Sequence, residues 1–182
     1  MAVVQQGRIE NVTLYDVRLI FKNFSGKAGM FNAEGERSFG IALPQDIADS
    51  MSALGWPVKL LKAREEGDLP QPYISVKVKY TPNSRPPKAT LVTSKGKNPL
   101  DENLISTIDY ADIISSDVIL RAYQYDFNGN QGVTAYLNSI FVTIREDELD
   151  LKYSEVPDAI PAGQHAAYPS EPVWGSDEER PF

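Results

Sequence analysis

The chain has 182 residues, 42% of them hydrophobic, a formal net charge of −7, one histidine and no cysteine. The length allows one domain of ordinary size plus a tail, and the missing cysteines exclude disulfides and thiolate sites and suit a reducing cytoplasm. No apolar run approaches the roughly 18 residues of a membrane span, and the first residues lack the basic and apolar regions of a secretory signal.

Hydrophobic periodicity in the first half predicts strands around one clear helix. The expected elements are a strand within 11–24, an exposed turn region over 23–35, a returning strand over 37–43, a helix over 44–55 and a short strand over 58–61. The first strand alternates, which places Val17, Leu19 and Phe21 on one face. Pro44 suits the first turn of the helix and Gly55 suits its end.

The second half is richer in strands. The expected elements are a strand over 73–80, a loop over 81–88, a short strand over 89–93, a basic loop over 94–99, a short helix over 101–108, and long strands over 117–127 and 133–144. The dipeptide Asn128-Gly129 predicts a tight hairpin between the last two. Together the pattern predicts a β-rich α+β fold, a single five-stranded OB-fold barrel with one or two added helices. The pattern alone also fits another small barrel or sandwich.

The net charge is unevenly distributed along the chain. Residues 146–182 hold ten acidic and two basic residues, a net charge of −8, so the preceding residues carry +1. Within 59–97 the balance is +6. After residue 146, proline, alanine, glycine and serine dominate, which predicts a disordered acidic tail over 154–182 behind a folded domain over 1–153. The negative net charge therefore belongs to the tail, and it does not exclude a nucleic-acid partner for the body.

Basic and aromatic side chains recur on the polar faces and loops of the body. Single-stranded nucleic acids bind to positive grooves in which aromatic rings stack on bases. The candidate contacts are Lys22, Phe24, Lys27, Phe31, Arg37, Tyr73, Lys77, Lys79, Arg85, Lys88, Arg121, Tyr123 and Tyr125. Alternation places Lys77 and Lys79 in one positive row, and it places Tyr123 and Tyr125 on the face of Arg121. Phe39 and Phe141 are expected in the core.

The end of the chain forms a compact motif. An apolar ring and a free carboxylate after a run of acids suit a hydrophobic pocket with a basic rim on a partner protein. The residues expected to dock are Asp177, Glu178, Glu179, Pro181 and Phe182. Arg180 departs from an all-acidic pattern.

This tip resembles that of bacterial single-stranded-DNA-binding proteins, which end in an acidic stretch and Pro-Phe. The body is similar to a bacteriophage and prophage family of single-stranded-DNA-binding proteins over most of residues 8–153. The matching stretches are 24–27 with Phe31-Asn32 and Gly35, then 55–59, 64–68, 85–88, 109–113 and 135–137. The resemblance implies an OB-fold protein that coats and protects single strands during phage replication and recombination. It also implies recruitment of a polymerase, helicase, primase or recombinase through the tip.

Catalytic and cofactor sites are not expected. The only histidine, His165, lies in the predicted tail, so no structural zinc site and no Ser-His-acid triad fits the folded body. We expect no metal, no cofactor, no enzymatic activity and no membrane contact. Two alternatives stay open, a virion structural or interaction protein without DNA binding and an annealing or RNA-binding OB module. The sequence leaves both a monomer and a homo-oligomer open.

Overall fold

The computed structural model describes residues 8–30, 32–62, 65–83, 85–153 and 156. It divides into two compact units, residues 1–146 and 147–182. In the second unit the described element is the short helix α2 (Glu148–Lys152). The predicted tail, apart from Val156, lies outside the described residues.

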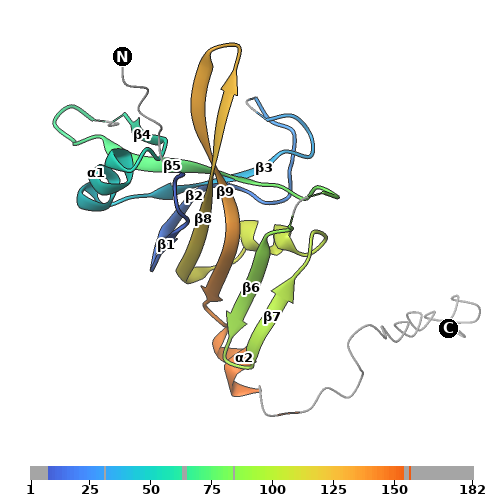
Figure 1. The fold of residues 1–182 in the computed structure, drawn as a ribbon. Helices are drawn as coiled ribbons and strands as arrows, with labels where there is room; N and C mark the ends of the chain where they lie inside the picture. The colour runs from blue at the N-terminus through green and yellow to red at the C-terminus, as the bar shows by residue number, and fades with distance from the viewer. Residues whose placement is uncertain (1–7, 31, 63–64, 84, 154–155, 157–182) are drawn as a thin grey trace, which may run out of the picture. The chain divides into compact units, whose positions relative to one another are not determined.

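The described part of the first unit contains nine strands joined in one mixed sheet (Figure 1). They are β1 (Val12–Leu14), β2 (Arg18–Asn23), β3 (Arg37–Ala42), β4 (Val58–Leu61), β5 (Gln71–Val78), β6 (Lys88–Thr93), β7 (Gly96–Leu100), β8 (Ile113–Phe127) and β9 (Asn130–Ile144). The main path runs β1-β8-β9-β5-β3-β2, with β4 on β5, and β6 pairing with both β9 and β7. All pairs are antiparallel except β5 with β9 and β6 with β9.

The path begins with β1 and ends with β2, and these two strands follow each other directly in the sequence. Between β1 and β2 the backbone turns at Asp16, which has φ +48°. The N–H of Asp16 donates to Oδ1 of Asp117 at 2.8 Å, and the N–H of Val17 donates to the carbonyl of Ser116 at 2.8 Å. Strand β1 thus pairs with β8 and strand β2 with β3. The sheet therefore curls back on itself.

With β1 and β2 counted together, five strands form the partly open barrel of the OB type. They are β1/β2, β3, β5, β8 and β9, and the strands β4, β6 and β7 are additions to it. The predicted OB fold is confirmed, and so are the strands expected over 37–43, 58–61, 73–80, 89–93, 117–127 and 133–144. Alternate residues of these strands fill the core, including Phe39, Ile41, Ile74 and Val76, which are all at most 1% exposed.

The predicted helix is confirmed as α1 (Gln45–Ala53), which buries Ala48 and Met51. Pro44 precedes its first residue as the N-cap, and Gly55 follows its end with φ +97°, a backbone angle that favours glycine. Two other predictions differ from the structure. The expected basic loop over 94–99 contains β7, and the expected helix over 101–108 is a 3₁₀ helix, η1 (Ile105–Asp109).

Both errors have a physical reason. Strand β7 lies at the sheet edge, where Gly96, Asn98 and Pro99 are tolerated and no alternation of apolar residues is needed. Before η1, the carboxylate of Asp101 accepts hydrogen bonds from the N–H groups of Asn103 and Leu104 at 2.9 and 3.0 Å. This local bonding supports a tight turn at the position where the helix was expected to begin.

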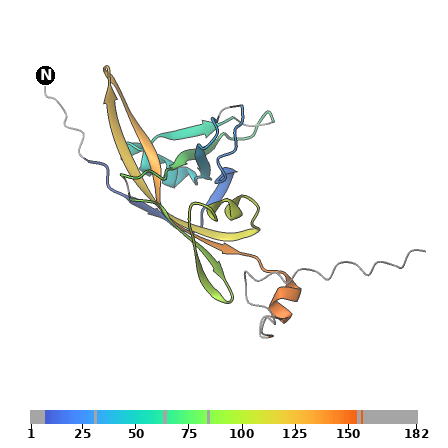
Figure 2. The same cartoon turned by 90° about the vertical axis from the view of Figure 1, so that its right-hand side faces the viewer.

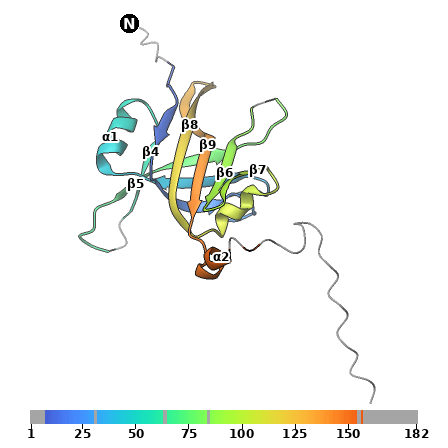
Figure 3. The same ribbon diagram turned by 90° about the horizontal axis from the view of Figure 1, so that it is seen from below.

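Strands β8 and β9 form the longest hairpin, with 15 residues in each strand. Its turn at Asn128 and Gly129 has positive φ at both residues, +52° and +81°, as the predicted tight hairpin requires. Residues 123–131 are exposed, and the two views in Figures 1 and 2 show this end of the hairpin extending beyond the neighbouring strands. Seen from below in Figure 3, β9 lies between β8 and β6.

Candidate nucleic-acid interface

Strand register gathers several of the predicted residues on one face. Ser38 pairs with Lys77, Lys77 with Tyr136, and Tyr136 with Arg121, across β3, β5, β9 and β8. Residues directly opposite each other in neighbouring strands point to the same side of a sheet. The residues next to them, Val76 and Ala135 among them, are buried in the barrel. This row therefore faces outward, and we call its side of β2, β3, β4, β5, β8 and β9 the outer face.

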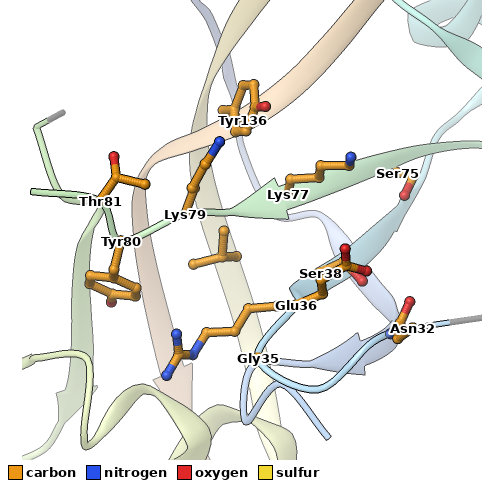
Figure 4. Close-up of a pocket in the computed structure, with 12 residues that line it drawn as sticks. Asn32, Gly35, Glu36, Ser38, Ser75, Lys77, Lys79, Tyr80, Thr81 and Tyr136 are labelled. Carbon is orange, nitrogen blue, oxygen red and sulfur yellow. The ribbon is translucent and has the colours of Figure 1, made fainter. Parts of the chain in front are cut away.

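Cations and aromatic rings contact each other within this row. The guanidinium carbon of Arg121 lies 5.7 Å from the centroid of the Tyr136 ring. The Tyr123 ring lies 6.1 Å from the same ring, edge-on at 78°. Lys77 and Lys79 are both exposed, as the predicted positive row requires. In Figure 4 the amino group of Lys79 points toward Tyr136.

A cavity of about 500 Å³ opens at this point of the outer face. Its lining comes from the loop between β2 and β3, from β3, from β5 and the three residues that follow it, and from Tyr136 of β9 (Figure 4). The lining residues are Asn32, Gly35, Glu36, Arg37, Ser38, Ser75, Lys77, Val78, Lys79, Tyr80, Thr81 and Tyr136. In OB folds the loop between the first two barrel strands, the face of strands two and three, and the loop between strands four and five bind oligonucleotides. The equivalent parts here are the loop over 24–36, the face of β3 and β5, and the β8–β9 hairpin.

A second row lies toward the other end of β5. Arg18 pairs with Ala42, Ala42 with Tyr73, and Tyr73 with Lys59, across β2, β3, β5 and β4. Tyr73 thus lies on the outer face, four residues along the strand from Lys77. That separation corresponds to about 13 Å.

Between the two rows the outer face carries small residues on β3 and β5. Gly40 pairs with Ser75 there, and a Cβ added to Gly40 would lie 2.9 Å from the Ile20 side chain. The space above Gly40 is thus filled by Ile20 from β2. On β3 and β5 the two positions between the rows are thus a glycine and a serine, with Ile20 of β2 beside the glycine.

Phe21 was expected beside Val17 and Leu19, and this prediction is wrong. The register of β2 against β3 shifts between Ile20 and Asn23, and Phe21 has φ +50°. This bulge turns the side chain outward. Phe21 is 62% exposed, and its ring contacts the Tyr73 ring edge-on, at 6.0 Å and 73°.

The β8–β9 hairpin extends the outer face. Arg121, Tyr123, Tyr125 and Phe127 alternate on one side of β8, as predicted, and all four are exposed. The ring of Tyr125 lies across Gly132 of β9, where a Cβ would overlap its phenol end. Glycine at this position therefore leaves the space in which the Tyr125 ring lies flat against the hairpin.

Phe24 does not have the predicted stacking role, because its ring is fully buried. It stacks on Phe39 with 4.8 Å between centroids. Its backbone is held as well, since the carboxylate of Asp109 accepts hydrogen bonds from the N–H groups of Phe24 and Ser25 at 2.8 and 2.9 Å. Phe24 anchors the base of the loop over 24–36, and a base has no access to its ring.

Arg37 is also held by the fold. Its Nε donates to the carbonyl of Phe24 at 3.0 Å, and Nη1 lies 3.3 Å from the carboxylate of Glu102. The guanidinium lies over the Tyr80 ring, 5.3 Å from its centroid. Arg37 lines the cavity but its charge is paired. Burial raises the pKa of the Tyr80 hydroxyl.

The remaining candidates lie apart from the outer-face rows. Lys22 donates to the carbonyl of Ile108 at 3.3 Å, Lys27 donates to the Tyr110 hydroxyl at 2.7 Å, and Lys88 lies over the Phe141 ring at 5.7 Å. The bond to Tyr110 raises the pKa of Lys27. Arg85 is exposed.

Some candidates lie outside the described residues. They are Phe31 and the candidate docking residues Asp177, Glu178, Glu179, Pro181 and Phe182. Of the two aromatics expected in the core, Phe39 is 1% exposed and Phe141 is half-buried.

Site prediction from the sequence missed Tyr136. This residue lies between Arg121 and Lys77 and contacts Arg121 and Tyr123. In the sequence, nothing distinguishes Tyr136 from the other residues of a strand that is half apolar. Only the parallel pairing of β9 with β5 brings it next to Lys77.

In the described part of the chain, no helix is long and apolar enough to cross a membrane. The same residues contain no group of three or more histidine, cysteine, aspartate or glutamate side chains placed to hold a metal ion.

A curled five-stranded sheet whose outer face carries cations beside aromatic rings defines the class of oligonucleotide-binding barrels. A family model described as "Putative phage ssDNA-binding domain" matches residues 1–173. The chain belongs to this family and is accordingly a phage-type single-stranded-DNA-binding protein.

Solved structures share the fold. The single-stranded DNA-binding protein from bacteriophage Enc34 aligns with a TM-score of 0.51 and 13% identity, over 80% of this chain and 88% of its own. The same phage protein in complex with ssDNA aligns with a TM-score of 0.50 and 15% identity, over 75% and 88%. No curated protein sequence matches the chain.

Proposed function

We propose that the outer face binds single-stranded DNA without sequence preference. Lys77, Lys79 and Arg121 contact backbone phosphates, and the rings of Tyr136 and Tyr123 stack on bases. The observation that carries this proposal is the row in which an aromatic ring lies between exposed cations, Lys77 on one side and Arg121 on the other. Such a row offers charge to the backbone and π-faces to any base.

Two neighbouring parts of the barrel complete the binding surface. The loop over 24–36 and the β8–β9 hairpin, with Tyr125, flank the row where OB folds bind oligonucleotides. Tyr73 continues the surface along β5. Smaller contributions to DNA binding are expected from Lys22, Lys27, Arg37 and Lys88 than from the cations of the row, because each already has a partner within the fold.

We propose a non-enzymatic role in which the protein coats and protects single strands in the host cytoplasm during phage replication and recombination. The acidic tip, Asp177 to Glu179 with Pro181 and Phe182, recruits a replication or recombination protein. A variant that lacks Pro181-Phe182 is expected to keep its affinity for single strands and to lose binding to that partner. Equal partner binding by both forms would argue against this role of the tip.

The DNA-binding proposal is tested by titrating labelled oligo-dT, oligo-rU and duplex DNA with the full chain and following anisotropy. We expect tight binding to oligo-dT and much weaker binding to the duplex. Equal or tighter binding to oligo-rU would favour an RNA-binding module. Faster pairing of complementary strands would favour an annealing protein, and absence of any binding would favour a virion interaction protein.

A further inference from the structure

A second aromatic cluster, with one exposed and one half-buried ring, lies on the outer face, away from the row around Tyr136. It consists of Phe21 and Tyr73, whose rings meet edge-on at 6.0 Å. Phe21 is 62% exposed, so most of its ring is open to solvent. An exposed π-surface beside a proposed strand-binding row is the element that base stacking requires.

The backbone at Phe21 makes this exposure unusual. Among the described residues three non-glycine positions have positive φ, namely Asp16, Phe21 and Asn128. Aspartate and asparagine tolerate this region, whereas a bulky aromatic residue there is an outlier. Such outliers cost energy and gather at functional sites. In the regular register Phe21 would follow Val17 and Leu19. The bulge instead turns the ring to the side that carries Tyr73.

The charges around this cluster point to a nucleic acid rather than to an apolar partner. Arg18 and Lys59 lie at the two ends of the row that holds Tyr73, and both are exposed. No ion pair among the described residues involves either side chain. The cluster thus also has a cation on each side, Lys59 next to Tyr73 and Arg18 one strand further on, beyond Ala42.

We infer that Phe21, with Tyr73, forms a second base-stacking position on the outer face, where Arg18 and Lys59 contact the adjoining phosphates. The inference rests on the proposed function, because the two positions bind one continuous strand. Tyr73 and Lys77 are separated by about 13 Å along β5. The strand passes between them over Gly40 and Ser75, the small residues that pair there.

The test uses variants that separate stacking from folding. Phe21→Leu keeps an apolar side chain and removes the π-face, and Phe21→Gly removes the ring and relieves the positive φ. Both are expected to bind oligo-dT about 5- to 150-fold more weakly than the wild type. Phe21→Gly is expected to keep or raise the melting temperature. Tyr153→Leu, which removes an exposed ring from the second unit, is the matched control and is expected to bind like the wild type.

A spectroscopic probe reports on the position directly. Phe21→Trp in a Trp174→Phe background leaves Trp56, which is 3% exposed, as the other indole. Oligo-dT is expected to quench the emission of the indole introduced at position 21 at saturation. Wild-type affinity of Phe21→Leu together with unchanged emission of the introduced indole would overturn the inference. A lower melting temperature for Phe21→Gly would do so too, because it would assign Phe21 a structural role. Failure of the wild type to bind would instead refute the proposed function.

Discussion

The salt dependence of binding gives the sharpest test of the outer face. Each phosphate that a lysine or arginine neutralises releases counterions, so the logarithm of the affinity for a single strand falls against the logarithm of salt with a slope of about −0.7 per contact. The row around Tyr136 supplies three cations, Lys77, Lys79 and Arg121. A slope of about −2.1 is expected from this row alone.

Removing one of these charges changes the slope by a fixed amount. Between about 50 and 200 mM salt, three contacts weaken binding about 18-fold and two contacts about 7-fold. Lys77→Gln and Arg121→Gln are each expected to make the slope about 0.7 less steep. Arg145→Gln removes one positive charge at the far end of β9, where Arg145 pairs with Asp112 at 3.7 Å, and is the control. Its slope is expected to equal that of the wild type.

The assay is a series of oligo-dT titrations at several salt concentrations, followed by anisotropy. An unchanged slope in both Lys77→Gln and Arg121→Gln would refute phosphate contact by this row. An equal loss of slope in Arg145→Gln would show that overall charge, and not the outer face, sets the affinity. Weaker binding with an unchanged slope would mean that Arg121 acts only by positioning the Tyr136 ring.

Three further predictions concern other parts of the barrel. Gly132→Val displaces the Tyr125 ring, so in oligo-dT titrations it is expected to weaken binding to the same extent as Tyr125→Ala; wild-type affinity of Gly132→Val alone would contradict the placement of the ring. Phe24→Ala empties a fully buried site stacked on Phe39, and urea unfolding is expected to show a loss of about 3–5 kcal/mol; a loss below about 1 kcal/mol would argue against a structural role. Tyr80→Phe removes a buried hydroxyl that has no hydrogen-bond partner and whose pKa is raised, so it is expected to be at least as stable as the wild type. Because the pKa is raised in the folded state, ionisation of Tyr80 leaves the stability of the wild type unchanged below about pH 10 and lowers it as the pH rises above that value. Denaturant midpoints of the wild type, but not of the variant, should show this loss, and parallel pH profiles would refute it.

Local sequence patterns predicted most of the barrel. Strict alternation predicted the strand over 73–80 with the correct faces, and Asn128-Gly129 predicted the hairpin, because both features depend on nearest neighbours in the chain. Strand β7 was missed because an exposed edge strand needs no apolar pattern. Phe21 was assigned to the wrong face because a bulge inserts a residue without changing the composition of the strand.

Prediction of which candidate side chains are exposed on one face succeeded where the polar face of one strand carried the signal, as for Lys77, and for Arg121 with Tyr123. It failed for Phe24, because a phenylalanine in a glycine-rich loop gives no local indication that Phe39 and Asp109 will hold it. Tyr136 was missed for a related reason. Its place in the row is set by a parallel pairing between strands about sixty residues apart, which no local window contains.

The split strand at the start of the barrel also determines when the barrel can close during synthesis of the chain. Leu14 of β1 pairs with Val118 of β8, which lies 104 residues later in the sequence. At a translation rate of about 5–20 residues per second, β1 leaves the ribosome roughly 5–20 s before its partner exists. Hairpins such as β2 with β3 form from local contacts in the meantime, but the barrel closes only after β8 and β9 emerge. The nascent protein therefore passes through a period in which the outer face is only partly assembled.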